Sequence, residues 1–130
     1  MALLGEMVLN SGQILSPRDH LTYNEGGFIS SISYAAQTPW LQHQSIRENI
    51  LFGSQFEKER YESVIVSCAL GPDLALLENG DDTKIGSNGI NLSGGQKARV
   101  ALARAVYAKS KYVLLDDPLS TVVSNIITMQ

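Results

Sequence analysis

The sequence has a single cysteine and no excess of basic residues. Cys68 stands alone among 130 residues, so no disulfide can form within the chain, and a reducing compartment suits it. We expect this thiol to serve as a small apolar group in the core. The formal net charge is −3, whereas general nucleic-acid binders usually carry a positive excess. This charge balance argues against nucleic acid as a partner.

Long apolar runs are also missing. A membrane-spanning helix needs roughly 18 or more apolar residues in succession, and the best stretch, residues 63–77, is interrupted by Gly71, Pro72 and Asp73. The first nine residues are mostly apolar, but Glu6 interrupts them and no basic segment precedes them, so we reject a signal peptide. We expect any link to a membrane to run through partner segments outside this chain.

Local patterns predict a mixed α/β chain. Hydrophobic residues make up 44% of it and charged residues 18%, as in a globular domain. Residues 1–7 resemble the end of a helix, the turn signal "NSG" favours a hairpin around it, and residues 31–36 alternate as a strand does. Ser45 and Glu48 form a capping-box pattern at the start of a helix, and Gly53 suits its C-terminal end.

Three further elements follow along the chain. Residues 57–70 are expected to form an amphipathic helix that Gly71-Pro72 stops, with one or two more helical turns over residues 73–80. The clearest helical pattern in the sequence covers residues 95–108. Its apolar residues form one stripe: Ala98, Leu102, Ala105 and Val106. The run "YVLLDD" then predicts a buried parallel strand with carboxylates at its carboxyl end, where open α/β sheets gather ligands.

The start of the strongest helix suggests an anion site. Unpaired N–H groups and the helix dipole favour an anion there, and Gly94 and Gly95 have no Cβ to block its approach. Ser93 adds a hydroxyl group and Gln96 an amide that both donates and accepts. Taken alone, the same residues also fit an ordinary serine cap followed by glycines.

The acidic pair after the predicted strand favours the anion-site interpretation. An aspartate at a strand end beside a phosphate site typically holds Mg²⁺, which is the role expected of Asp116. Asp117 follows it and could orient or deprotonate a water molecule. The alternative for both is a solvated turn ahead of Pro118.

Together these residues resemble a known family. The stretch "LSGGQKARVALARAVYAKSKYVLLDDPLS" resembles the signature motif and Walker B strand of ABC-transporter nucleotide-binding domains, and "YAAQTPWLQHQSIRENILFG" is similar to their Q-loop segment. The residues of these stretches are similar to those of the C subfamily, the multidrug-resistance-associated type. Within it, "LLDDPLS" resembles the first nucleotide-binding domain. The resemblance covers residues 1–122, and residues 123–130 form an atypical tail.

The resemblance implies a role for each matching residue. Gln37 is the expected Q-loop glutamine, which senses Mg²⁺ and water and couples to the transmembrane domains. The expected signature, Leu92–Gln96, closes over the γ-phosphate of an ATP molecule bound by a second nucleotide-binding domain. Asp116 is the expected Mg²⁺ aspartate, and Asp117 stands where competent domains carry a glutamate base. The cations of the signature helix are expected to lie on a solvated face: Lys97, Arg99, Arg104, Lys109 and Lys111.

The sequence lacks one motif of the family and differs from the family at three positions. No Gly-Lys dipeptide occurs in the 130 residues, so the phosphate loop G-x-x-x-x-G-K-[ST] is absent. The expected fold is therefore a partial P-loop NTPase core with an α-helical subdomain, lacking the Walker A strand and loop. Val123 replaces the D-loop aspartate, and Ser87 replaces a glutamate that faces the membrane domains. Asp117 in place of glutamate implies slow hydrolysis.

Three functions are weighed on this basis. The first is a fragment of the ATP-hydrolysing domain of an ABC exporter, working with ATP and Mg²⁺ on the cytoplasmic side of a membrane, although the isolated chain is expected to be inactive. The second is a non-catalytic module that offers its signature face to another nucleotide-binding domain. The third, a soluble ABC ATPase of DNA repair or translation, is disfavoured because no coiled-coil insertion precedes the signature.

Overall fold

The computed structural model describes residues 8, 10–13, 32–86 and 90–116. The elements, in chain order, are β1 (Ile32–Ala35), α1 (Ile46–Leu51), α2 (Lys58–Ser67), α3 (Gly71–Ala75), η2 (Gly80–Asp82), α4 (Gly94–Tyr107) and β2 (Tyr112–Leu115). The expected helix end at residues 1–7 lies outside the described residues, as do Ser87, Asp117 and Val123. Of the expected hairpin strands, Val8 and Gln13 are described and are not in a strand, and the other residues lie outside the description. None of the helices in the described part is long and apolar enough to cross a membrane.

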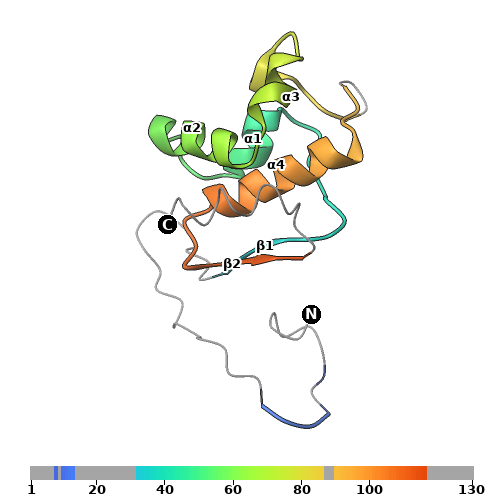
Figure 1. Ribbon diagram of the computed structural model, residues 1–130, viewed down its shortest axis with the longest axis vertical. Helices are drawn as coiled ribbons and strands as arrows, with labels where there is room; N and C mark the ends of the chain where they lie inside the picture. The colour runs from blue at the N-terminus through green and yellow to red at the C-terminus, as the bar shows by residue number, and fades with distance from the viewer. Residues whose placement is uncertain (1–7, 9, 14–31, 87–89, 117–130) are drawn as a thin grey trace.

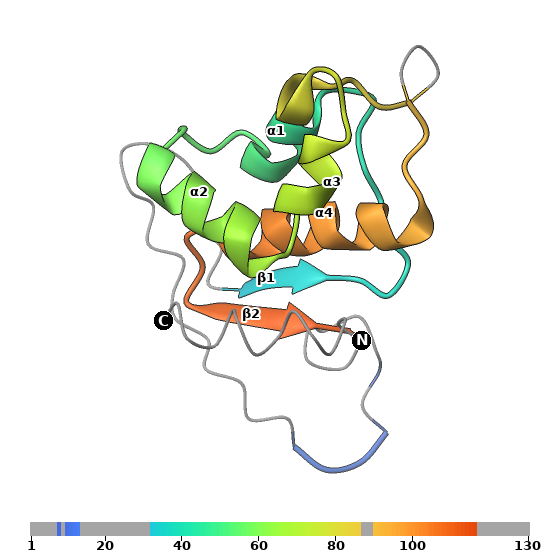
Figure 2. The ribbon, with the colours of Figure 1, turned by 45° about the horizontal axis from the view of Figure 1, so that its top comes forward.

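The strands form a parallel pair, as the sequence pattern of β2 predicts. β1 and β2 run side by side with Ala35 opposite Leu115, although 76 residues separate the paired strands' nearest ends, Ala35 and Tyr112. Helix α4 lies directly on this pair, and α1, α2 and α3 lie on the far side of α4 (Figures 1 and 2). Both strands are half-buried along their length, so the expectation of a fully buried strand is wrong.

Helix α1 confirms the capping box. The Ser45 hydroxyl oxygen accepts from the Glu48 N–H, and the Glu48 carboxylate accepts from the Ser45 N–H. These bonds satisfy two of the N–H groups that a helix start leaves unpaired. The hydrogen bond from the Ser45 N–H also holds the pKa of Glu48 below its ordinary value.

The boundary between α2 and α3 differs from the expectation. α2 ends at Ser67, and Ala69 has a left-handed φ of 52° before the chain turns into α3. Gly71 and Pro72 begin α3 and do not stop α2. Proline suits the first turn of a helix because its missing N–H would be unpaired there in any case.

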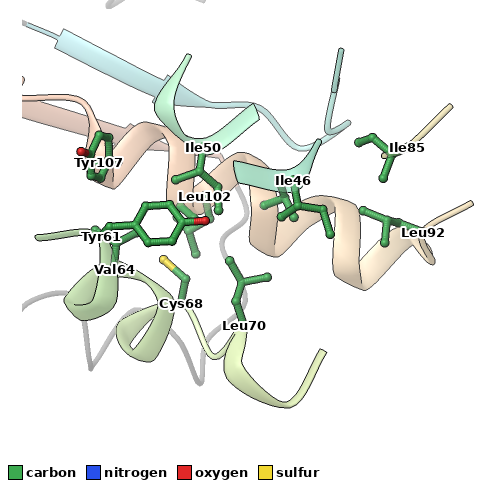
Figure 3. Close-up of a cluster of buried hydrophobic side chains, with 12 residues drawn as sticks. Ile46, Ile50, Tyr61, Val64, Cys68, Leu70, Ile85, Leu92, Leu102 and Tyr107 are labelled. Atoms are coloured by element: carbon green, nitrogen blue, oxygen red, sulfur yellow. The ribbon is translucent and has the colours of Figure 1, made fainter. Parts of the chain in front are cut away.

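The core sits between α4 and the other helices. Figure 3 shows side chains from α1, α2 and the α2–α3 turn converging on α4. Ile50, Val64 and Cys68 are fully buried, which confirms the expected role of the cysteine. Of the predicted stripe on α4, Leu102 and Ala105 are buried, whereas Ala98 and Val106 are half-buried. Burial reaches residues outside the stripe because helices pack on one side of α4 and strands on the other. The buried residues of α4 are Val100, Leu102, Ala103, Ala105 and Tyr107.

Candidate nucleotide site

The start of α4 is capped by its own side chains. The Ser93 hydroxyl oxygen accepts from the Gln96 N–H at 3.3 Å, and the Gln96 Oε1 accepts from the Ser93 N–H at 2.9 Å. The first four N–H groups of a helix have no partner within it, and this capping box satisfies the first and the fourth. The remaining two belong to Gly94 and Gly95, and no hydrogen bond joins either of them to a described residue.

Among the described residues, the space where a Cβ would sit on these two glycines is open. A Cβ placed on Gly94 would meet no atom within 4 Å, and one on Gly95 would meet only the Arg99 guanidinium at 3.5 Å. Neither glycine has a positive φ, so backbone strain does not call for glycine there. Internal packing does not require them either. Two exposed N–H groups at a positive helix end, without side chains over them, suit a bound anion. The serine-cap reading and the anion reading are thus compatible.

A carboxylate from α3 holds this helix start. Asp73 accepts from the Arg99 Nε at 2.7 Å and from its Nη2 at 2.9 Å, and the Gln96 Nε2 donates to the same carboxylate at 3.4 Å. The Arg99 guanidinium is the main cause of the lowered pKa of Asp73. Sequence reasoning missed this contact, and the only signal for it was an acidic residue next to Pro72.

The expected solvated face of cations is wrong for Arg99 and Arg104. The Arg99 side chain is 24% exposed and paired with Asp73. Arg104 donates to the Trp40 and Asn49 backbone carbonyls and to the Asn49 Oδ1, and its guanidinium lies 4.7 Å from the Phe52 ring centroid. Desolvation lowers the pKa of Arg104. Both cations are drawn inward because backbone and side-chain oxygens satisfy their N–H groups.

The second group of expected residues gathers at the carboxyl edge of the strand pair. Asp116 directly follows β2, and Gln37 lies two residues beyond the end of β1. The Asp116 N–H donates to the Ala35 carbonyl at 3.0 Å, which continues the pairing to this edge. The Tyr34 hydroxyl donates to Asp116 Oδ2 at 3.0 Å, a contact that the sequence did not predict.

This edge offers the chemistry that Mg²⁺ takes in nucleotide sites. Both Asp116 and Gln37 are exposed, and they present a carboxylate and an amide oxygen. Mg²⁺ usually binds one or two carboxylates and fills its other positions with water and substrate phosphates. No group of three or more acidic, histidine or cysteine side chains gathers in the part of the chain that the structure describes. The donor set therefore fits an ion that arrives with a nucleotide.

Comparison with known proteins decides the family. The model of the ABC transporter family matches residues 1–120. The chain belongs to the ABC transporter family. It is 50% identical over 130 residues to ABC transporter 7 of Pyricularia oryzae and 48% identical over 129 residues to the ATP-dependent bile acid permease of Saccharomyces cerevisiae, and each match covers 96% of this chain and 8% of the relative. ABC transporter C family member 5 of Dictyostelium discoideum is 50% identical over 121 residues, covering 93% of this chain and 8% of the relative.

These matches confirm the resemblance to C-subfamily transporters. A relative from Caenorhabditis elegans, 49% identical over 121 residues, is named multidrug resistance protein mrp-7. The chain thus spans less than a tenth of the length of these relatives. The family match implies a P-loop NTPase fold and ATP as the nucleotide, with Mg²⁺ as its usual companion.

Proposed function

We propose that the chain is part of the ATP-hydrolysing domain of an ABC exporter, and that its Ser93–Gln96 turn completes a nucleotide site on a second such domain. The observation that carries this proposal is the pair of N–H groups on Gly94 and Gly95 at the start of α4. Neither makes a hydrogen bond to a described residue, and the space where a Cβ would sit on each glycine is open. A γ-phosphate presented by a facing domain would accept from both of them. The Ser93 hydroxyl would add a third donor.

In this proposal the carboxyl edge of the strands contacts a second ATP molecule, different from the one that the Ser93–Gln96 turn meets. We assign Asp116 as the Mg²⁺ ligand and Gln37 as a ligand of the ion or its water. When bound, Mg²⁺ would neutralise charge on the phosphates. Asp117 takes the base position, and its side chain is one methylene shorter than the glutamate of competent domains. We therefore expect slow proton abstraction there.

The 130 residues supply only part of that second site. Without a G-x-x-x-x-G-K-[ST] segment, no lysine or backbone cradle holds the β- and γ-phosphates. The Walker A strand and loop are therefore missing from the proposed fold, in which residues 1–122 form the partial domain and residues 123–130 a tail. We expect the isolated chain to show no ATPase activity above background, although the family hydrolyses ATP.

The transmembrane domains of a transporter are the second proposed partner, and they would place this domain on the cytoplasmic side of a membrane. Trp40 is 61% exposed and Phe52 is 49% exposed, and their rings meet edge to face at 6.3 Å. Arg104 lies over both rings. Exposed aromatic residues beside a cation are typical of protein contact surfaces.

A chimera tests the proposed function. This chain would replace the matching segment of the yeast permease, which is 48% identical to it, and ATP-dependent bile acid uptake and ATPase activity would be measured in vesicles. Gly94→Asp places a carboxylate where the γ-phosphate would lie, so we expect it to abolish both activities. Glu62→Gln, on the exposed side of α2, is the control and should retain them. Full activity with Gly94→Asp would refute the proposal.

The alternative, a non-catalytic module that offers its signature face to another domain, is favoured by the missing phosphate loop alone. Both functions use the same face, so the chimera does not separate them. Full-length transcripts do: a G-x-x-x-x-G-K-[ST] coding segment in frame upstream supports the exporter domain, and authentic start and stop codons around the 130 residues support the module.

A further inference from the structure

We propose that Asp73 is a positioning residue for the Ser93–Gln96 turn: its carboxylate fixes the Gln96 amide and the first turns of α4 so that the Gly94 and Gly95 N–H groups face the phosphate. This inference rests on the proposed function of that turn. Asp73 does not belong to the signature motif. It lies 20 residues before Ser93 in the sequence, on α3.

The geometry joins two turns of α4 to one anchor. Gln96 and Arg99 are three residues apart, so they lie on the same face of the helix. Both donate to the Asp73 carboxylate, Arg99 through two N–H groups at 2.7 and 2.9 Å and Gln96 through Nε2 at 3.4 Å. A bidentate guanidinium–carboxylate pair fixes direction as well as distance. The start of α4 is therefore held against α3 at two successive turns.

The contact with Asp73 also decides which way the Gln96 amide faces. Because Nε2 donates to Asp73, Oε1 faces the Ser93 N–H and accepts from it at 2.9 Å. With the amide reversed, an NH₂ group would face the Ser93 N–H, and the capping box would be lost. The cap in turn fixes the Ser93 backbone and the two glycines that follow. Asp73 thus acts on the glycine N–H groups through Gln96.

The chain offers a matched control pair. Asp81 accepts from the Arg47 Nε and Nη2, each at 3.0 Å, and its side chain is 18% exposed against 16% for Asp73. Asp81 also accepts from the Tyr61 hydroxyl at 2.7 Å. Within the part of the chain that the structure describes, Asp81 makes no hydrogen bond or ion pair with the Ser93–Gln96 turn. Asp81→Asn therefore breaks an arginine–carboxylate pair whose carboxylate is about as buried as that of Asp73, although Arg47 is more exposed than Arg99, without touching the helix start.

The experiment measures ATPase kinetics of the chimeric permease that carries the full chain, with Asp73→Asn, Asp73→Glu and Asp81→Asn compared at equal amounts of trypsin-resistant transporter. ATP binding energy comes mainly from the facing domain, which is unchanged, so misplacing the turn should act on kcat. We expect Asp73→Asn to lower kcat about tenfold while the KM for ATP stays within about twofold. Asp73→Glu keeps the charge and should recover at least half of the lost activity.

The outcomes separate this inference from the proposed function. A kcat loss with Asp73→Asn that Asp81→Asn does not share supports the positioning role. Equal losses for the two variants, an unchanged kcat, or a change confined to KM would overturn it, and so would an Asp73→Glu variant no better than Asp73→Asn. If Gly94→Asp abolishes activity while Asp73→Asn leaves it intact, the positioning role alone is wrong. If Gly94→Asp is also harmless, the proposed function is wrong.

Discussion

Replacing Gly95 by alanine should stabilise the fold of the chain and lower the ATPase activity of the chimeric permease. Gly95 lies in the first turn of α4 without a positive φ, and the nearest atom to a new Cβ is the Arg99 guanidinium at 3.5 Å, an ordinary contact distance. Alanine at a compatible glycine position stabilises a protein by about 0.4–1 kcal/mol, chiefly by restricting the unfolded chain. No contact in the described structure offsets that gain.

The functional effect has the opposite sign. A Cβ on Gly95 occupies space that the proposed phosphate would need, and it lies beside one of the two N–H groups that would donate to the phosphate. Removing a single well-placed donor to a developing negative charge typically lowers kcat by about 10²–10³-fold. A displaced donor costs less than a removed one, so we expect a decrease of about tenfold or more in the chimeric permease.

Two assays and one control variant test this prediction. Pulse proteolysis in urea, at submicromolar chain concentration, reports the unfolding midpoint, and Gly95→Ala should raise it by roughly 0.3–0.5 M. A Cβ on Gly53 would meet nothing within 4 Å, but Gly53 has a φ of 84°, so Gly53→Ala should lower the midpoint through backbone strain alone. A lowered midpoint for Gly95→Ala, or undiminished ATPase activity of the chimera that carries it, would refute the reasoning.

Three more predictions concern the rest of the chain. Asn49→Ala should lower the free energy of unfolding by about 3 kcal/mol in pulse proteolysis, because Asn49 is fully buried and its side chain makes four hydrogen bonds. Glu62→Gln, in an exposed pair, should change it by less than about 0.5 kcal/mol, and equal effects of the two variants would contradict this prediction. Arg99 holds the pKa of Asp73 below its ordinary value, so the stability that this pair adds is complete above the ordinary aspartate pKa and is lost as the pH falls through the lower, folded-state pKa. The urea midpoint should therefore decline less steeply over that acidic range in Asp73→Asn than in the unchanged chain, and parallel curves would contradict this. Burial raises the pKa of the Cys68 thiol to about 12, so iodoacetamide should label Cys68 at neutral pH only when urea unfolds the chain, and rapid labelling without urea would show that the core is open.

Local sequence signals predicted the elements best where the physical cause was itself local. The capping box at Ser45 was predicted because its two partners lie three positions apart in the sequence. The box at Ser93 has the same spacing, but only a serine cap was predicted there. Strand β2, which ends just before Asp116, was predicted from its apolar run and the acids that follow it. Its parallel pairing with β1 brings Gln37 to the same edge. The predicted boundary between α2 and α3 was wrong because proline favours a helix start as readily as it ends a helix.

Contacts between distant residues could not be predicted from the sequence. Asp73 and Arg99 are 26 residues apart, and Arg104 reaches Trp40 across 64. A single sequence shows a basic residue on a helix but not the carboxylate or carbonyl oxygen that will meet it. Both arginines were therefore assigned to solvent, and the anchor of the candidate site was missed.

Vanadate photocleavage tests the central claim most directly. Vanadate takes the place of the γ-phosphate, and ultraviolet light then cleaves the protein backbone at the residues that contact the vanadate. In the chimeric permease trapped with Mg²⁺, ADP and vanadate, the account predicts cleavage at Ser93–Gly94, with loss of the product in Gly94→Asp. Trapping with cleavage elsewhere and none between residues 92 and 96 would show that this turn does not meet a nucleotide.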